Sequence, residues 1–516
     1  MIVRIQSAGV TGISASPVDV EVDGAPIGRG GGDAHFAVVG LPDKSITESR
    51  ERVRAAISNS NYDFPAMHIT VNLAPADLKK EGPAYDLPIA VGVLGVSNQI
   101  DANAISRHAV IGELALDGRV RPVAGVLPIA IELKRRHVKS LIVPVDNAGE
   151  AAVVQGIEVI PVDHLREVVG FINGNLPIEP FHADVEKYFE HVSEHPFDFG
   201  DVKGQESAKR ALMIAAAGGH NVLMLGNPGV GKSMLSKRLP TVLPRMTLDE
   251  ALETTKVYSV AGQVTRETPL ITQRPFRAPH HTISDAGMIG GGTTPRPGEI
   301  SMAHNGVLFL DEFPEFNRKT LEVMRQPLED GTVTISRASG SLTFPARLML
   351  IAAMNPCPCG YLGHPKKKCS CTTRMIAQYR SKISGPLLDR IDIHLEVPSV
   401  DFKELSGEAR GMTSSEMFSH VQRARDVQTA RFKRAREGLH NNAGMNDKEV
   451  STYATLRPEV KSLLDTAMET LHLSARAYTR IRKIARTIAD LDGAQDIGAE
   501  HITEAIGYRT LDRAEA

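Results

Sequence analysis

Residues 226–233, GNPGVGKS, contain the residue types that bind the phosphates of a nucleotide. They fit the pattern G-x-x-x-x-G-K-[ST], follow the apolar stretch NVLMLG and precede an expected helix that starts near Met234. Glycines let backbone N–H groups turn toward phosphates, and the start of the helix adds positive potential there. We expect Lys232 to reach the β- and γ-phosphates of ATP and Ser233 to bind Mg²⁺. The predicted nucleotide-binding residues are Gly226, Asn227, Pro228, Gly229, Val230, Gly231, Lys232 and Ser233.

The stretch GVLFLDEF, residues 306–313, predicts a buried strand that ends in two acidic residues. Asp311 is suited to hold Mg²⁺, and Glu312 is suited to accept a proton from the attacking water. An acidic pair says little by itself, because acids also cap helices. After a phosphate-binding loop, however, the pair predicts ATP hydrolysis.

Three further residues carry side chains suited to a transferring phosphate. The stretch RLMLIAAMNP predicts a strand that ends at Asn355, whose amide would contact a γ-phosphate. Arg390 in LLDRIDI and Arg476 in SARAYTRIRKIARTIADL offer guanidinium groups, which stay charged and bind phosphates bidentately. Surface arginines are common, so these two side chains alone predict no role.

All four cysteines lie in the stretch CPCGYLGHPKKKCSC, as the pairs Cys357 with Cys359 and Cys369 with Cys371. Four thiolates fill the tetrahedral shell of Zn²⁺, and so few clustered cysteines favour a metal over a disulfide framework. We therefore predict a structural zinc that holds the loop at residues 357–371. An iron–sulfur cluster and reduced thiols are the alternatives, because C-x-C is less typical of zinc than C-x-x-C.

The length and composition of the chain limit the class of protein that contains these sites. The 516 residues exceed one compact core, and 42% hydrophobic with 23% charged residues are typical of a globular protein. A net charge of -2 gives no overall attraction to nucleic acid, so DNA binding would need a local basic surface. We find no signal-peptide pattern and no apolar stretch of about 20 residues, and expect a cytoplasmic protein without a membrane span.

Four regions differ in their sequence pattern. Residues 1–170 predict a mixed α+β domain, and residues 171–199, rich in Pro, His and acids, predict a linker. Residues 200–400 repeat strand, glycine-rich turn and helix, which predicts a parallel α/β sheet, and residues 401–516 predict a helical domain. The clearest expected elements are strands at residues 68–74 and 139–145 and helices at 46–59, 414–437, 457–471 and 474–491.

In their order along the chain these motifs resemble those of the AAA+ ATPases: Walker A, Walker B, sensor 1 at Asn355, arginine finger at Arg390 and sensor 2 at Arg476. The resemblance implies an α/β fold class with a parallel-sheet nucleotide-binding core and a C-terminal helical lid domain. In that family the finger acts across a subunit interface. A homo-oligomeric ring, commonly a hexamer, is therefore implied.

Two inserts resemble those of the magnesium chelatase and MCM-like branch of AAA+ proteins. The stretch PFRAPHHTISDAGMIGGGTTPRPGEI contains Arg277, His280 and His281, and TVTISRASGSLTFPA predicts a β-hairpin with Arg337 near its tip. In MCM helicases such hairpins grip DNA in the pore, which makes these four residues candidate DNA contacts. A plain sheet extension is the alternative for the hairpin. The basic stretch at residues 423–436 is a further candidate for phosphate contacts.

The first domain resembles the Lon protease domain, which has an α+β (S5-like) fold. The stretches KKEGPAYDLPIAVGVLG and LDGRVRPVAGVLPIAIELKRRHVKSLIVPVDN carry this likeness. By that match Ala84 stands at the position of the serine nucleophile and Ile129 at that of its lysine base. Such a peptidase needs a hydroxyl and an amine. We therefore predict a Lon-like domain that lacks the catalytic dyad and serves assembly or substrate binding.

Taken together, these features are similar to those of the ComM/YifB family, which has the same order of Lon-like domain, AAA+ core, cysteine loop and helical domain. The resemblance implies a hexameric ATP-dependent DNA helicase that promotes branch migration of forked or branched DNA in recombination and natural transformation, with recombination proteins as candidate partners. The alternatives are a metal-chelatase subunit, a protein-remodelling chaperone and a Lon-like protease. Stimulation of ATP hydrolysis by DNA, by a porphyrin-binding partner or by unfolded protein would distinguish them.

Overall fold

The structure is a computed structural model of the 516-residue chain. It describes residues 1–26, 35–80, 82–190, 196–292, 295–337, 340–399, 411–436, 438–509 and 511. The chain forms two compact units, and neither is continuous in sequence. The first comprises Met1–Val192, Leu248–Thr272 and Ser336–Phe344, and the second comprises Ser193–Thr247, Gln273–Ile335 and Pro345–Ala516.

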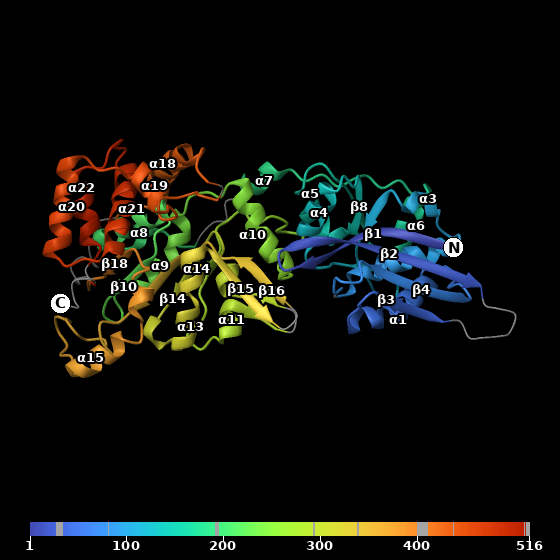
Figure 1. The fold of residues 1–516 in the computed structure, drawn as a ribbon, viewed down its shortest axis with the longest axis horizontal. Helices are drawn as coiled ribbons and strands as arrows, with labels where there is room; N and C mark the ends of the chain where they lie inside the picture. Colours follow the sequence, from blue (N-terminus) through green and yellow to red (C-terminus); the bar gives the residue numbers. More distant parts are fainter. Residues whose placement is uncertain are drawn as a thin grey trace. The chain divides into compact units, whose positions relative to one another are not determined.

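The first unit is built on a seven-stranded sheet in the order β3-β4-β2-β1-β5-β8-β9 (Figure 1). Strands β1 and β2 are antiparallel and are joined by a tight turn at Gly12, whose φ of +63° favours glycine. Strand β2 is also antiparallel to β4, whereas the other neighbouring strands run parallel. The strands are β1 Ile2–Thr11, β2 Ser14–Pro26, β3 Phe36–Val39, β4 Met67–Ala74, β5 His108–Val110, β8 Ser140–Pro144 and β9 Glu158–Val162, with a small pair β6 Glu113–Leu114 and β7 Val120–Arg121.

Helices cover the sheet of the first unit. Helix α2 (Asp86–Val96) is buried along its whole length and packs on β1 and β2. Helix α10 (Leu248–Val260) lies between the two ATPase motifs in sequence but belongs to this unit and packs on α4 (Val126–Arg135). The other helices are α1 Lys44–Asn59, α3 Ala102–Ile105, α5 Ala148–Ala152, α6 Leu165–Ile172 and α7 Val185–Glu190.

The second unit contains a five-stranded parallel sheet in the order β11-β14-β17-β10-β18. The strands β14 and β17 are buried at every residue, as expected for central parallel strands covered on both faces. The strands are β10 Val222–Leu225, β11 Phe276–Arg277, β14 Val307–Leu310, β17 Met349–Met354 and β18 Ile393–Glu396. Between them lie α9 Lys232–Arg238, α11 Asp285–Ile289, α12 Glu299–Met302, α13 Arg318–Val323, α14 Arg325–Asp330, α15 Thr373–Arg380 and α16 Gly385–Leu388.

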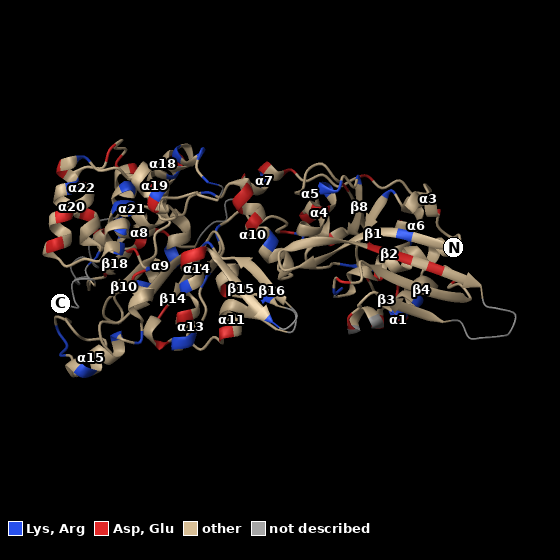
Figure 2. Ribbon diagram, in the orientation of Figure 1, with Lys and Arg blue, Asp and Glu red and all other residues tan. Residues whose placement is uncertain are grey.

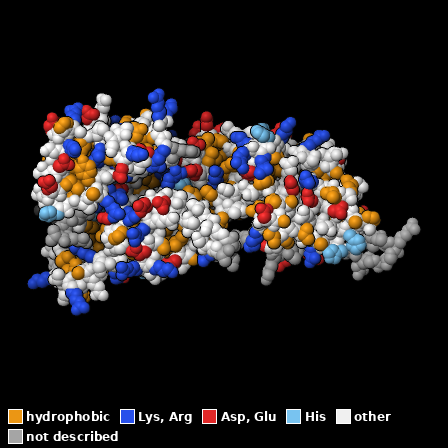
Figure 3. Space-filling view, viewed as in Figure 1, with side chains coloured by type: hydrophobic (Ala, Val, Ile, Leu, Met, Phe, Trp, Pro, Cys, Tyr) orange, Lys and Arg blue, Asp and Glu red, His pale blue; other side chains and the backbone are white. Residues whose placement is uncertain are grey.

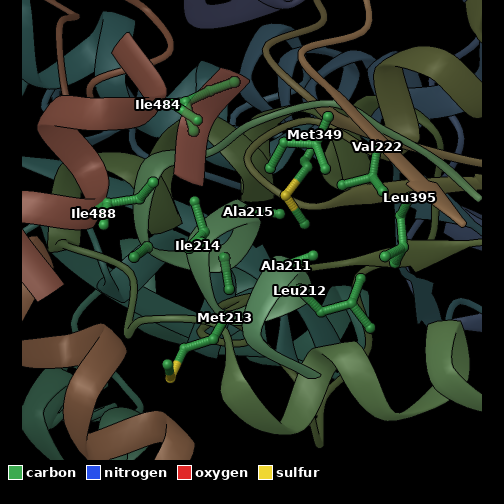
Figure 4. Packing of buried hydrophobic residues seen from close by; sticks show 14 of the residues in the cluster. Ala211, Leu212, Met213, Ile214, Ala215, Val222, Met349, Leu395, Ile484 and Ile488 are labelled. Carbon is green, nitrogen blue, oxygen red and sulfur yellow. The ribbon is translucent and has the colours of Figure 1, made fainter. Parts of the chain in front are cut away.

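A single hydrophobic core joins this sheet to the C-terminal helices. Helix α8 (Glu206–Gly218) supplies the middle layer: its Leu212 and Ala215 lie near sheet residues such as Val222, while Ile484 and Ile488 come from the C-terminal helix α21 (Figure 4). The C-terminal helices are α18 Ser414–Phe432, α19 Asp447–Tyr453, α20 Pro458–Thr470, α21 Ala475–Leu491 and α22 Ala499–Gly507. The shared core keeps the helical region packed against the sheet that carries the ATPase motifs.

The predicted fold class is confirmed: a parallel α/β sheet, a helical C-terminal region and a mixed N-terminal domain are all present. The expected strands and helices correspond to β4, β8, α1, α18, α20 and α21, although α18 ends at Phe432 and not at residue 437. The segment 171–199, expected to be a linker, contains helix α7. Among the described residues, no helix is both long enough and apolar enough to cross a bilayer.

The predicted hairpin is present as β15 (Thr332–Arg337) and β16 (Gly340–Pro345), and the two tip residues between the strands lie outside the described residues. These strands form a two-stranded sheet of their own. The alternative of a plain extension of the main sheet was therefore wrong.

Candidate nucleotide and metal site

Three neighbouring strands bring the ATPase motifs to one edge of the parallel sheet. Strand β17 lies between β10, which leads into residues 226–233, and β14, which ends before Asp311. Leu225 pairs with Met354 and Leu310 with Ala352, so the carboxyl ends of all three strands are level within a few residues. Ligands of parallel α/β sheets bind at this edge.

Lys232 and Asn355 are in direct contact. The ammonium nitrogen of Lys232 donates to Asn355 Oδ1 at 3.1 Å, and also to the backbone oxygens of Gly226 and Asn227 at 2.6 and 3.0 Å. Burial lowers the pKa of Lys232, although the nearby charge of Asp311 acts in the opposite direction. The structure therefore joins the predicted phosphate-binding lysine to the predicted sensor.

Ser233 and Asp311 are also joined, because the hydroxyl of Ser233 donates to Asp311 Oδ2 at 2.5 Å. A hydroxyl and a carboxylate side by side provide two of the oxygen ligands that Mg²⁺ takes, while its remaining positions go to phosphates and water. Gly229 has a φ of +82°, and a Cβ placed there would meet nothing within 4 Å. Gly229 thus faces open space, and the hydroxyl and carboxylate beside the loop fit the oxygen ligands of a Mg²⁺ ion.

Glu312 lies beside His281, which the sequence predicts as a candidate DNA contact. Its carboxylate is 59% exposed, and Oε2 lies 3.4 Å from His281 Nδ1. The ring of His280 lies 4.1 Å from that of His281, and His280 Nδ1 contacts the hydroxyl of Thr282 at 2.9 Å. His281, predicted as a DNA contact, therefore lies at the predicted catalytic carboxylate.

The other two candidate DNA contacts are placed differently from each other. Arg277 makes a bidentate ion pair with Glu299, with N to O distances of 2.7 and 2.6 Å. Arg337 is exposed at the end of β15 and has no ion-pair partner among the described residues. The basic stretch at residues 423–436 is held within its own unit: Arg425 donates to Ala216 O and Arg431 pairs with Asp490.

Neither predicted arginine contacts residues 226–233 in the described part of the chain. Arg390 pairs with Glu329, which lowers the pKa of that carboxyl, and Arg390 Nη1 donates to Pro386 O at 2.6 Å. Its Nε is buried and finds no hydrogen-bond partner among the described residues. Both Arg390 and Glu329 line a cavity of about 430 Å³. Arg476 pairs with Asp389 at 2.7 Å and is 64% exposed.

The sequence did not reveal a buried polar network beneath these arginines. Asp392 is almost fully buried, and it pairs with Arg480 and accepts from the backbone N–H of Asn221 at 3.1 Å. Its Oδ2 also lies 3.4 Å from His220 Nδ1. Burial alone would raise the pKa of Asp392, but the charge of Arg480 holds it well below its usual range. The signal in the sequence was an acid in LLDRIDI separated by one residue from an arginine, which is too common to assign.

The four cysteine sulfurs converge, with all Sγ atoms within 4.8 Å of one another. Cys357 Sγ lies 3.4 Å from Cys359 Sγ and 3.7 Å from Cys369 Sγ, close to the separation of about 3.8 Å that a tetrahedron with 2.3 Å zinc–sulfur bonds requires. The backbone N–H of Tyr361 lowers the pKa of Cys359 to about 5. Four sulfurs in this arrangement fit a Zn²⁺ ion.

The cysteine loop packs on the nucleotide-binding loop. Asn227 Nδ2 donates to the backbone oxygens of Gly360 and Leu362 at 2.6 and 3.3 Å. Gly360 has a φ of +81°, and a Cβ there would lie 2.6 Å from Pro228 Cγ. The two predicted sites are therefore neighbours, with the side chains of Asn227 and Pro228 packed against the backbone of the cysteine loop.

In the first unit, the residues at the two protease positions provide no catalytic group. Ala84 lies in the short 3₁₀ turn Pro83–Tyr85, and Ile129 is buried in α4 with 1% of its surface exposed. The match to the Lon dyad thus falls on a methyl group and on a core side chain.

Comparison with known proteins identifies related chains. Family models described as magnesium chelatase subunit ChlI match residues 198–405, 26–147 and, for its C-terminal part, 411–509. "Competence protein ComM" of Haemophilus influenzae is 43% identical over 512 residues, which cover 99% of this chain and 97% of that protein. YifB of Escherichia coli is 42% identical over 513 residues, with 99% and 97% covered.

Two partial matches concern single regions. "Lon protease 2" of Bacillus subtilis is 32% identical over 131 residues, which is 25% of this chain and 22% of that protein. "DNA replication licensing factor mcm7" of Schizosaccharomyces pombe is 27% identical over 170 residues, which is 30% of this chain and 20% of that protein.

Proposed function

The chain belongs to the ComM/YifB family of magnesium-chelatase-like AAA+ proteins, and from this we propose that it is a ring-forming ATPase that uses ATP hydrolysis to move along DNA. One observation carries the proposal. Lys232 contacts Asn355, and Ser233 contacts Asp311, at one edge of the sheet, and this arrangement supports a site for the phosphates and Mg²⁺ of ATP.

The residues of this edge divide the chemistry among them. Lys232 binds the β- and γ-phosphates of ATP in place of its present backbone acceptors, and Asn355 contacts the γ-phosphate. Ser233 and Asp311 would hold Mg²⁺, which neutralises phosphate charge when bound. Glu312 accepts the proton of the attacking water, and its exposed carboxylate is accessible to that water.

A ring accounts for the two arginines that do not contact the nucleotide-binding loop within one chain. Arg390, with a buried Nε that lacks a partner among the described residues, lines an open cavity. We propose that it exchanges Glu329 for the nucleotide of a neighbouring subunit, where its guanidinium stabilises transition-state charge. Arg476 is proposed to add a second positive charge near the phosphates. The expected assembly is a hexamer.

DNA is the partner that the family membership favours. The relative from Haemophilus influenzae is named as a competence protein, and the partial match to the licensing factor concerns a protein named for DNA replication. We propose branch migration of forked or branched DNA during recombination and natural transformation. The separate β15–β16 hairpin with exposed Arg337 suits a DNA contact in the pore.

The cysteine loop is proposed to hold one structural Zn²⁺. The sulfur separations fit a closed tetrahedral site, which leaves no open position for catalysis. Such an ion would fix an irregular loop directly beside the nucleotide.

The test is ATP hydrolysis by the purified full-length protein with and without forked or four-way DNA, while strand displacement is followed in the same reactions. Lys232→Ala serves as the blank. Stimulation by DNA together with displacement supports the proposal. Hydrolysis that DNA does not change, without displacement, would reject it and favour a chelatase subunit or a chaperone.

A further inference from the structure

The longest stretch of the chain without acidic residues includes the cysteine loop. Between Gly331 and Leu388 there is no Asp or Glu, although the average of 61 acids in 516 residues would place about seven there. The same 58 residues contain eight lysines and arginines. The segment, which includes the cysteine loop and α15, therefore has a net charge of +8 in a chain whose net charge is -2.

The basic side chains at the far end of this segment are exposed and largely unpaired. Lys366, Lys367, Lys368 and Arg374 are exposed, and Arg380 is half-buried. Lys366, Lys368, Arg374 and Arg380 have no acidic partner within 4 Å in the described ranges, and Lys367 lies 4.8 Å from the ring centre of Tyr361. We call these five residues the basic knuckle.

The figures show the same distribution. In Figure 2, α15 and the segment that leads into it carry blue positions without red ones. In Figure 3, Lys and Arg side chains project at the lower left, where α15 lies in Figure 1. An exposed surface of one sign attracts a polyanion, and its attraction is strongest where no acid neutralises it.

The cysteine loop, which precedes α15 and contains three residues of the basic knuckle, contacts the nucleotide-binding loop. Cys357 is fully buried, and Gly360 and Leu362 accept hydrogen bonds from Asn227 in the nucleotide-binding loop. Strand β17, which precedes the cysteine loop, ends at Met354, and the next residue, Asn355, contacts Lys232. The segment that carries the basic knuckle is therefore joined by hydrogen bonds to residues 226–233.

We propose that the basic knuckle binds the DNA phosphate backbone and transmits this binding to the nucleotide-binding loop through the contact between Gly360 and Asn227. The proposal rests on the proposed DNA function and assigns it a surface separate from the hairpin. Lysines on a loop bind phosphates as point charges, without reading sequence. The binding therefore weakens steeply with salt, because each neutralised phosphate contributes about 0.9 to the slope of log K against log salt.

The test compares two triple variants with the same change in net charge. One is K366Q/K367Q/K368Q in the knuckle, and the control is K139Q/K448Q/K461Q, three exposed lysines on other elements. Affinity for a fluorescent forked DNA is measured by anisotropy at several salt concentrations, and the apparent affinity for ATP is measured with and without that DNA. Metal content and thermal unfolding of both variants check that the loop remains folded.

We expect the knuckle variant to bind DNA about tenfold or more weakly, with a salt slope smaller by about two to three, while the control stays close to wild type. DNA should also improve the ATP affinity of the wild type and the control but not of the knuckle variant. Arg374→Glu, outside the cysteine loop, should weaken DNA binding in the same direction.

Three results would overturn the inference. Equal DNA affinity of the two triple variants, with stimulation intact in both, would reject the knuckle while leaving the proposed function standing. Absence of DNA binding by the wild type would reject the proposed function and the knuckle together. Binding of the wild type to vesicles containing phosphatidylserine, but not to DNA, would identify the surface as a membrane contact.

Discussion

His281 Nδ1 lies 3.4 Å from Glu312 Oε2, at the end of the strand that carries the Walker B acids. Glu312 itself has a left-handed backbone, with a φ of 52° and a ψ of 44°. The direction of its carboxylate is therefore set by a strained backbone position and by an imidazole from the preceding insert. His281, which we predicted to touch DNA, thus contacts the carboxylate that we propose to activate water.

Replacement of His281 by Ala should lower kcat for ATP about tenfold and leave KM nearly unchanged. The imidazole contacts the proposed base and is not among the residues expected to bind the phosphates, so its loss should misplace the carboxylate and leave nucleotide binding intact. Steady-state hydrolysis and nucleotide binding measure the two effects. His280→Ala is the matched control, because His280 contacts Thr282 and should retain kcat. An equal loss in both variants would mean that the insert as a whole, and not this contact, supports the carboxylate.

Replacement of Glu312 by Gln should lower kcat for ATP hydrolysis about 100-fold or more, while ATP binding and assembly persist. The amide keeps the size of the side chain but cannot accept the proton of water. Binding of a fluorescent ATP analogue and size-exclusion chromatography establish that the variant is intact. Normal turnover would show that water is activated elsewhere.

Removal of the metal should loosen the structure of the cysteine loop and also weaken ATP binding. The purified protein should contain one zinc per chain, and Cys369→Ser should lose most of it, because three sulfurs leave a tetrahedral site open. The apparent ATP affinity should then fall severalfold, since Gly360 and Leu362 no longer hold Asn227. Elemental analysis and nucleotide titration measure both, with Ser370→Ala in the same loop as control. Iron with visible absorption would identify an iron–sulfur cluster instead.

Strongly periodic stretches and motifs could be predicted from the sequence because they depend on local patterns. The strand before residues 226–233 and the strand before Asn355 were found from their apolar residues and the polar residues that follow. The convergence of four sulfurs followed from two close C-x-C pairs. These features need only short-range information, so the sequence contains them.

Features that depend on long-range contacts were not predictable in this way. Helix α10 packs on α4, more than 100 residues earlier, and nothing in its own sequence indicates the partner. The contact of His281 with Glu312 and the pairing of Arg277 with Glu299 depend on how an irregular insert folds back. Helix α7 was also not predicted, because its six residues are too few to show a periodic pattern within a segment rich in Pro, His and acids.

Replacement of Asp392 by Asn should destabilise the protein by about 3–5 kcal/mol at neutral pH, because it leaves Arg480 without its buried partner. The pKa of Asp392 is lowered in the folded state. Its stabilising effect is therefore present above the unfolded pKa, near 4, and is lost as the pH falls toward the folded pKa. The difference between variant and wild type, measured by denaturant unfolding, should shrink below about pH 4.

Asp389→Asn is the control for this change, because Asp389 forms an exposed pair with Arg476 in the same segment. Exposed pairs contribute about 0–1 kcal/mol, so this variant should unfold almost like the wild type. Equal destabilisation by the two substitutions would show that burial of Asp392 does not determine its effect.

Two glycines of the cysteine loop allow the contact between the loop and the nucleotide site to be tested by the same substitution. Gly360 and Gly363 both have left-handed backbones, with φ of +81° and +73°, so alanine strains each of them similarly, by about 1 kcal/mol. A Cβ at Gly360 would lie 2.6 Å from Pro228 Cγ, whereas one at Gly363 would meet nothing within 4 Å. We therefore expect Gly360→Ala to raise KM for ATP about five- to tenfold with its zinc retained, because Pro228 must move, and Gly363→Ala to keep KM near wild type. Steady-state ATP hydrolysis and metal content are measured for both variants. Equal KM values would mean that the nucleotide-binding loop does not depend on the cysteine loop. DNA binding at the basic knuckle could then not affect ATP binding through the contact of Gly360 with Asn227.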